Sequence, residues 1–258
     1  MCRPPRVTAR VAAIIFLVTA PATGHERWSI SAIVGALPAV AERSEMVDIG
    51  GAVIDRYEST NAEFVAFVAA TGYRTDAERS GVGWHWEGVW RTVPGADWRH
   101  PHGPGSSIVG LERHPVVQVS WNDARAYCAW RGKRLPRGLE WERAAGAADG
   151  RRYPWGSAAP RDGGVYRASY GSDECCRADA HDGYLYTAPV GSFPLGRSPT
   201  GVEDLAGNVW EWTDEARGDH EVLRGGGWGN NPWGLGIALK HTNPPDIGLS
   251  MVGIRCAD

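Results

Sequence analysis

Glycine and proline recur so closely along this chain that long regular elements have little room. The 258 residues include 34 Gly and 17 Pro, together with 13 Trp. Gly and Pro favour turns and interrupt helices and strands, whereas each buried Trp ring removes on the order of 200 Å² of surface from water. The sequence therefore predicts loops and turns around a tryptophan-rich core, in one large domain or two small ones.

The N-terminus predicts a cleaved signal peptide over residues 1–22. A basic start with three arginines precedes the apolar run 11–20, and the Ala-Pro-Ala segment 20–22 fits a small-x-small cleavage pattern. The apolar run is shorter than the ~20 residues that span a bilayer. We therefore expect export to a periplasmic, secreted or secretory-pathway location without a stable membrane anchor. Residues 23–45 are expected to form a linker, and 46–258 the folded domain.

Charge and cysteine content narrow the class of protein further. The net charge is −3, with no strongly basic balance, so the sequence does not predict nucleic-acid binding. After signal cleavage the chain keeps Cys128, Cys175, Cys176 and Cys256, in a compartment that permits disulfides. Spacing alone leaves all three pairings open.

The first half of the domain carries clear local signals. Residues 46–54 read as a strand interrupted by a Gly-Gly turn. The segment 60–63 (Thr-Asn-Ala-Glu) is a capping box, in which hydroxyl and carboxylate satisfy each other's free amides. Phe64 and Phe67 then fall on one face, and Gly72 ends the predicted helix.

Later segments become shorter. Residues 116–120 alternate like a strand, and Ser120 then caps a second helix that ends at Gly132. A third helix is expected over 138–145, although Arg137 is a poor cap. Beyond it, brief segments are separated by Gly, Pro and Asp. The sequence thus predicts a single α+β domain of irregular topology, with little regular secondary structure.

Nine short blocks occur in order across roughly residues 50–258: 54–73, 95–104, 114–136, 140–146, 153–156, 181–193, 207–212, 224–228 and 253–257. Together they resemble the formylglycine-generating enzymes, also called sulfatase-modifying factors. The resemblance implies a variant of the C-type-lectin fold that is stabilised by calcium.

The resemblance implies a calcium site in the segment 204–211. Its ligands would be the side chains of Asp204 and Glu211 and the carbonyls of Gly207 and Val209. Calcium prefers six to eight such oxygens. The alternative is a solvated acidic loop beside a Trp-rich core.

A second calcium site would use Asp182 and the carbonyl of Tyr184. Ala168 and Ser169 stand where the family has its remaining ligands, an Asn and a carbonyl donor, which puts this site in doubt. Glu58 matches a further calcium ligand of the family, and it could equally be a helix-cap carboxylate.

The family resemblance also implies a disulfide between Cys128 and Cys256. The alternative is two buried free thiols. For the adjacent Cys175 and Cys176 we expect a surface disulfide or pairing with another chain, with a relocated redox centre as the alternative.

The cysteines that carry the family's copper chemistry are absent from their usual positions. Active members hold copper(I) with two cysteines five residues apart, shortly after an Arg-Gly-Gly turn, and thiolate suits this soft ion. Here no cysteine lies between Gly225 and Arg255, and Asn230 and Leu235 fall near those positions. We therefore expect Ca²⁺ rather than copper as the cofactor.

These features predict an exported family protein that binds a sulfatase-like protein or a Cys-containing peptide without forming formylglycine. One alternative is an oxidoreductase of the same superfamily with another metal or cofactor centre, acting on an exported substrate. His100 and His102, two residues apart, suit loop packing as well as metal ligation.

A second alternative is a lectin-type ligand-binding module. It would bind sugar or peptide in an aromatic and amide pocket after the Arg-Gly-Gly turn. The expected lining residues are Trp228, Asn230, Asn231 and Trp233.

Overall fold

The computed structural model describes residues 45–174 and 176–258, which belong to one unit of the chain. The predicted signal peptide, nearly all of the predicted linker and Cys175 lie outside the described residues. Within the described part, no helix is long and apolar enough to cross a membrane.

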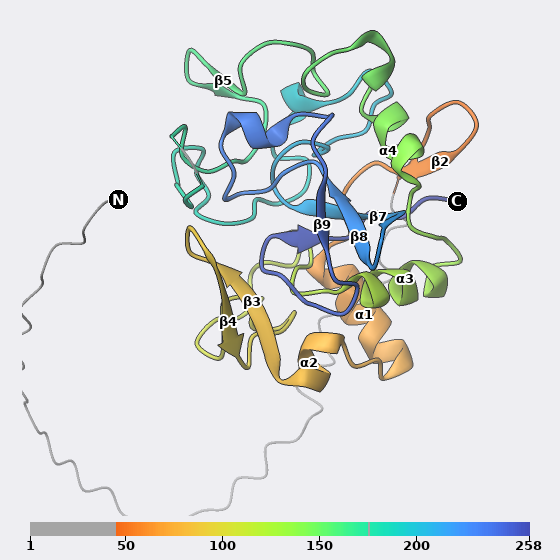
Figure 1. The fold of residues 1–258 in the computed structure, drawn as a ribbon, viewed down its shortest axis with the longest axis vertical. Coiled ribbons are helices and arrows are strands. Elements are labelled where there is room, and N and C mark those ends of the chain that lie inside the picture. Colours follow the sequence, from red (N-terminus) through yellow and green to blue (C-terminus); the bar gives the residue numbers. More distant parts are fainter. Residues whose placement is uncertain (1–44, 175) are drawn as a thin grey trace, which may run out of the picture. The chain divides into compact units, whose positions relative to one another are not determined.

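Short helices and small sheets alternate along the chain (Figure 1). The helices are α1 (Asn61–Thr71), α2 (Asp76–Ser80), α3 (Trp121–Trp130) and α4 (Gly138–Ala144), with 3-10 turns η3 (Ala147–Asp149), η4 (Pro194–Gly196) and η5 (Pro232–Leu235). The strands are β1 (Met46–Asp48), β2 (Val53–Asp55), β3 (Val82–Trp86), β4 (Trp90–Pro94), β5 (Arg161–Asp162), β6 (Val165–Tyr166), β7 (Trp210–Arg217), β8 (His220–Arg224), β9 (His241–Asn243) and β10 (Val252–Gly253).

The main sheet has four strands in the order β10-β7-β8-β9. β7 pairs antiparallel with β8, β8 antiparallel with β9, and β10 parallel with β7. The other sheets are two-stranded: β1-β2, β3-β4 and β5-β6. In Figure 1, α1 and α3 lie below the blue strands of the main sheet, and the green and cyan loops lie above them. The predicted α+β class with little regular structure is confirmed.

The predicted capping box at 60–63 and the predicted Ser120 cap are both present. In α1, Thr60 accepts from the Glu63 amide and the Glu63 side chain accepts from the Thr60 amide, and Gly72 follows in the left-handed conformation (φ 66°). Ser120 and Asp123 form the same arrangement at the start of α3. The third predicted helix is α4, in which Arg137 makes no side-chain cap.

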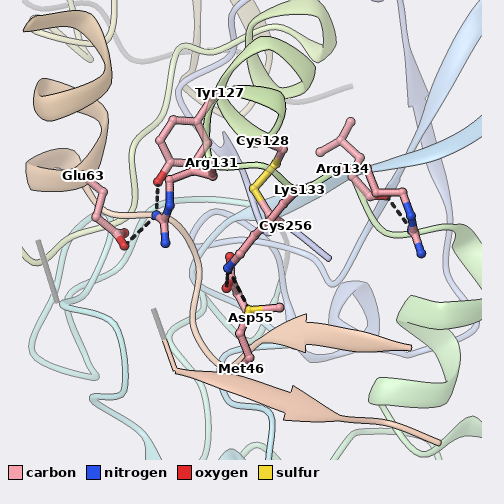
Figure 2. The surroundings of a disulfide bond; sticks show 10 residues. Met46, Asp55, Glu63, Tyr127, Cys128, Arg131, Lys133, Arg134 and Cys256 are labelled. Carbon is pink, nitrogen blue, oxygen red and sulfur yellow. Dashed lines mark hydrogen bonds and ion pairs between the residues drawn. A yellow bond between two sulfur atoms is a disulfide. The ribbon is translucent and has the colours of Figure 1, made fainter. Parts of the chain in front are cut away.

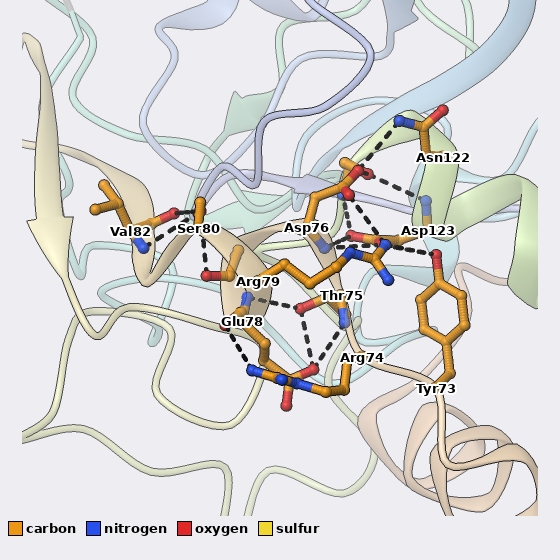
Figure 3. A network of polar contacts seen from close by, with 12 residues as sticks. Tyr73, Arg74, Thr75, Asp76, Glu78, Arg79, Ser80, Val82, Asn122 and Asp123 are labelled. Carbon is orange, nitrogen blue, oxygen red and sulfur yellow. Dashed lines mark hydrogen bonds and ion pairs between the residues drawn. The ribbon is translucent and has the colours of Figure 1, made fainter.

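A polar network not predicted from sequence joins α2 to the start of α3 (Figure 3). The Ser120 hydroxyl donates to Asp76 Oδ2 at 2.6 Å, and the Tyr73 hydroxyl donates to Asp123 Oδ1 at 3.0 Å. Asp123 is fully buried, and this burial raises the pKa of its carboxyl to about 6. The α3 cap therefore also holds α2 in place.

The strand predicted over 116–120 is wrong. Gln118 has φ 59°, and a left-handed residue interrupts the extended backbone that a ladder requires. The backbone amides of this segment go to different partners: Val116 donates to the Ser59 carbonyl, and Gln118 to that of Leu249. The segment is a buried, irregular crossing of the core.

The core holds many of the aromatic rings that the composition predicted. Its largest cluster includes Phe64, Trp98, Tyr127, Trp212 and Trp228 among its buried members. A second cluster surrounds Trp141. The first cluster includes Trp212 of β7, and Trp141 of the second donates to Glu211 of the same strand, so β7 links the two clusters.

Candidate functional site

The segment where the family would hold copper is packed as ordinary structure. Asn230 Oδ1 accepts from Trp210 Nε1 and from the Gly227 amide, both at 2.9 Å. Leu235 is fully buried beside Tyr153 in a small core cluster. The amide therefore bridges β7 to the turn, and the leucine fills the core.

The residues expected to line a lectin-type pocket lie in different environments. Trp228 is 1% exposed and donates from Nε1 to the Ser250 carbonyl, whereas Trp233 is 66% exposed. Asn231 caps η5 by accepting from the Gly234 amide. None of the four predicted lining residues, which include Asn230, lines the pocket described below. Trp228 therefore belongs to the core, whereas Trp233 lies on the surface.

The segment 204–211 surrounds a buried ion pair. Arg255 and Glu211 are both fully buried, and the guanidinium donates to both carboxylate oxygens, with a shortest distance of 2.6 Å. Trp141 Nε1 donates to Glu211 Oε2 at 2.7 Å. A cation at the first predicted calcium site would therefore share Glu211 with a guanidinium.

Two further buried carboxylates lie near this ion pair. Asp204 accepts from the Gly191 amide at 2.7 Å, and burial raises its pKa to about 6. Glu58 accepts from Asn208 Nδ2 at 2.6 Å, and burial together with Asp204 and Glu211 raises its pKa well above the usual range. Among the described residues, Arg255 is the cation that faces these three carboxyl groups, so the cluster holds more acidic than basic groups. The surplus of acidic groups fits a bound cation, whereas the ion pair between Glu211 and Arg255 does not, because it already neutralises that carboxylate.

At the second predicted calcium site, backbone amides already donate hydrogen bonds to the predicted ligand oxygens. Asp182 accepts from the amides of Tyr170 and Tyr184, and its pKa is raised by burial. The Ser169 carbonyl accepts from the Asn208 amide at 2.8 Å. Among the described residues, no three His, Cys, Asp or Glu side chains are grouped as metal ligands. Calcium at either site would depend on backbone carbonyls, and it stays a prediction.

The predicted disulfide between Cys128 and Cys256 is present (Figure 2). It joins α3 to the C-terminal segment across 128 positions of sequence, with a Cα–Cα distance of 5.6 Å. Ion pairs flank it on both sides: Lys133 with Asp55, and Arg131 with Glu63. The predictions for the pair 175–176 involve Cys175, which lies outside the described residues.

A histidine pair that sequence reasoning did not identify lies beside Trp228. His85 comes from β3 and His102 from the loop after β4, and their Nδ1 atoms are 3.2 Å apart. Ser250 Oγ is 3.0 Å from His85 Nδ1. Burial lowers the pKa of both imidazoles, that of His102 to about 4, with His85 contributing. Both rings therefore stay neutral near pH 7.

Sequence reasoning had grouped His102 with the wrong partner. His100, two residues earlier, contacts Asp97 instead. His85 belongs to the alternating stretch 82–86, whose inner positions are buried. That alternation was the available signal, but only the fold brings His85 to His102.

A pocket of ≈ 250 Å³ opens beside this pair. His102, Ser250 and Tyr186 line one end, and the ring centroids of His102 and Tyr186 are 4.0 Å apart. Asn61 lines the pocket as well; it is 4% exposed, and its Oδ1 atom has no hydrogen-bond partner. The remaining walls are mostly apolar: Pro101, Leu111, Pro115, Val117 and Leu185, together with His114, Gly183, Tyr184 and Thr187. Such a pocket can accept a ligand that has an apolar body and a hydrogen-bond donor.

Comparison with known proteins gives consistent matches. A family model described as the sulfatase-modifying factor enzyme 1-like domain matches residues 33–258. The formylglycine-generating enzyme of Mus musculus is 36% identical over 250 residues, which cover 82% of this chain and 67% of the mouse protein.

A relative described as inactive is similar to the same degree. The inactive C-alpha-formylglycine-generating enzyme 2 of Bos taurus is 39% identical over 233 residues, covering 79% of this chain and 76% of the bovine protein. Among solved structures, PvdO from Pseudomonas aeruginosa matches with a TM-score of 0.60 and 27% identity, covering 80% of this chain and 79% of that one.

Proposed function

Because the chain belongs to the sulfatase-modifying factor family, we propose that it binds a sulfatase-like protein or a cysteine-containing peptide without forming formylglycine. It is a family scaffold from which the copper-dependent step has been lost. The observation that carries this proposal is the packing of Asn230 and Leu235.

Neither residue can replace a copper-binding thiolate. The Asn230 oxygen already accepts two hydrogen bonds, and the Leu235 side chain is alkyl and fully buried. Copper(I) requires soft ligands, and the chain has no cysteine between Gly225 and Arg255. The existence of a 39% identical relative that is described as inactive supports the same conclusion.

Export of the protein forms part of the proposal. The Cys128–Cys256 disulfide supports it, because disulfides persist mainly in oxidising compartments. Calcium is the proposed cofactor, supported by the excess of buried carboxylates around Arg255. It would stabilise the scaffold rather than react.

The test is a copper(I) titration coupled to an assay for aldehyde on a Cys-x-Pro-x-Arg peptide. The proposal expects no aldehyde, with measurable binding of the peptide by fluorescence anisotropy. A variant with Cys175 and Cys176 replaced by Ser is the matched control, because it excludes any contribution of this cysteine pair to the copper signal. Aldehyde formation by this variant would overturn the proposal.

Restoring the thiols sharpens the test. The double variant N230C/L235C is expected to gain copper(I) binding that the parent chain lacks. If the parent and this variant bound copper equally, the assignment of the lost site to these positions would be wrong.

A second candidate function is an oxidoreductase of the superfamily that uses another centre. The observation in its favour is the neutral pair His85 and His102 beside a pocket. The lectin-type alternative loses support, because Trp228 and Trp233 lie in different environments.

A further inference from the structure

Three segments far apart in sequence bring polar atoms together at the end of the pocket. His85 is on β3, His102 is in the loop after β4, and Ser250 precedes β10. The backbone fixes this meeting, because Trp84 donates to the Gly248 carbonyl and Ser250 donates to the Trp84 carbonyl. The Gln118 side chain holds the loop by donating to the Pro101 carbonyl at 2.7 Å. The cluster is thus built by main-chain and buried contacts.

His85 Nδ1 cannot form good hydrogen bonds with both of its polar neighbours. A neutral imidazole Nδ1 carries either one proton or one lone pair, yet His85 Nδ1 has two close polar neighbours. These are His102 Nδ1 at 3.2 Å and Ser250 Oγ at 3.0 Å. The Ser250 oxygen already accepts from the Trp86 amide. Only one of the two neighbours can make a good hydrogen bond with His85 Nδ1.

The distance between the two nitrogens matches a pair of metal ligands. Zinc binds imidazole nitrogen at about 2.0–2.1 Å in tetrahedral sites. With that bond length, a separation of 3.2 Å corresponds to an N–Zn–N angle of about 100°, near the tetrahedral value. A linear two-coordinate ion would place the nitrogens about 4 Å apart with the same bond length, so the geometry does not suit it.

We propose that His85 and His102 bind a zinc-class divalent ion through their Nδ1 atoms, with Ser250 Oγ as a third, oxygen ligand. The fourth position faces the pocket, which His102 and Ser250 also line. Three protein ligands with one open position are the arrangement of catalytic rather than structural zinc sites. A group on a pocket ligand, or water, would complete the coordination.

The aromatic surroundings support an ordered, partly desolvated site. The Tyr186 ring lies 4.0 Å from the His102 ring and 4.9 Å from the Trp228 ring, centroid to centroid. These contacts fix the orientation of the His102 imidazole. Trp228 is itself held by its hydrogen bond to the Ser250 carbonyl. The same residue, Ser250, therefore positions the Trp228 ring and carries the hydroxyl of the cluster.

The experiment uses the tag-free exported chain, stripped of metal and then kept in excess Ca²⁺ so that any calcium sites are filled. Titration with Co²⁺ is followed by its visible absorption, and Zn²⁺ then competes. We expect one Co²⁺ per chain with the intense bands of a four-coordinate site, displaced by Zn²⁺. Loss of an outer-shell partner weakens metal binding about 10–100-fold, so H85A and H102A should weaken it at least tenfold each.

Two controls keep the result interpretable. H100A removes a nearby histidine that contacts Asp97 instead, and it should bind Co²⁺ like the parent chain. S250A preserves both nitrogens and should bind more weakly while changing the spectrum. If H85A or H102A failed to fold, imidazole ¹⁵N shifts of the parent chain would still show whether Zn²⁺ displaces a proton at Nδ1.

Two outcomes would overturn the inference. One is the absence of stoichiometric Co²⁺ or Zn²⁺ binding at micromolar concentration. The other is binding that is unchanged in the folded double variant H85A/H102A. Neither outcome depends on aldehyde formation, so this inference and the proposed function can fail separately.

Discussion

Removing the Cys128–Cys256 bond should cost a large part of the stability of the domain. The perturbation is the double variant C128A/C256A, which avoids leaving a single buried thiol. Both cysteines are fully buried, with 0% of their surface accessible to solvent. The bond joins α3 to the segment that follows β10, and no other described disulfide links them.

The magnitude follows from the length of the closed loop. The two cysteines are 128 positions apart, and the chain-entropy relation gives about 5 kcal/mol at 25 °C for a loop of that size. Domains are typically stable by about 5–15 kcal/mol, so the variant would approach the unfolding threshold. For a chain of this length the midpoint of thermal unfolding should fall by about 10–20 °C.

Urea unfolding of the variant and the parent measures this effect. The unfolded variant is no longer cross-linked and exposes more surface, so its m-value should rise while its midpoint falls. The reduced parent chain is the matched control, because it keeps both sulfur atoms and lacks only the bond. A loss below about 1 kcal/mol with an unchanged m-value would refute the loop-closure reasoning.

Three further predictions follow from the buried charges. R255M should destabilise the domain by about 3–5 kcal/mol in urea unfolding, because Glu211 loses its buried partner; R151M, at an exposed ion pair, is the control and should show no loss. The pKa of Asp123 is about 6 in the fold against 3.8 for an unperturbed aspartate, so the folded carboxyl keeps a proton that the unfolded one has lost. Stability should therefore fall as pH rises from about 4 to about 6 and then level off, by at most about 3 kcal/mol, and D123N should flatten this slope. If calcium binds at Asp204, adding it at a hundred times its Kd should stabilise the parent chain by about 2.7 kcal/mol, and D204N should abolish the effect; calorimetry that shows equal stabilisation of both chains would contradict the site.

Local signals in the sequence predicted local structure well. The α1 and α3 boundaries follow from a hydroxyl and a carboxylate three residues apart, at Thr60 and Glu63 and at Ser120 and Asp123, and both capping boxes formed. Such signals depend only on neighbouring residues. The Cys128–Cys256 pairing required more, because spacing alone left three pairings open and the family resemblance chose among them.

Features that depend on distant contacts were not predictable in this way. The alternation in 116–120 indicates a strand, yet Gln118 adopts φ 59°, and its side chain binds the carbonyls of Trp84 and Pro101. No local pattern shows that these partners exist. The environments of the residues expected to line a lectin-type pocket were not predictable either, since Trp228 is buried and donates to the Ser250 carbonyl.

Trp228 lies between the segment that lacks the family's copper cysteines and the histidine pair. Toward one side, the turn that begins at Gly227 is closed by Asn230, whose oxygen accepts from that amide and from Trp210. Toward the other, the Trp228 ring lies 6.1 Å from that of His85, centroid to centroid. Thiolates at position 230 could not reproduce the two hydrogen bonds of an amide oxygen, because sulfur is a weak acceptor. The segment therefore serves packing on this side of Trp228, and the metal site that we propose lies on the histidine side of the same tryptophan.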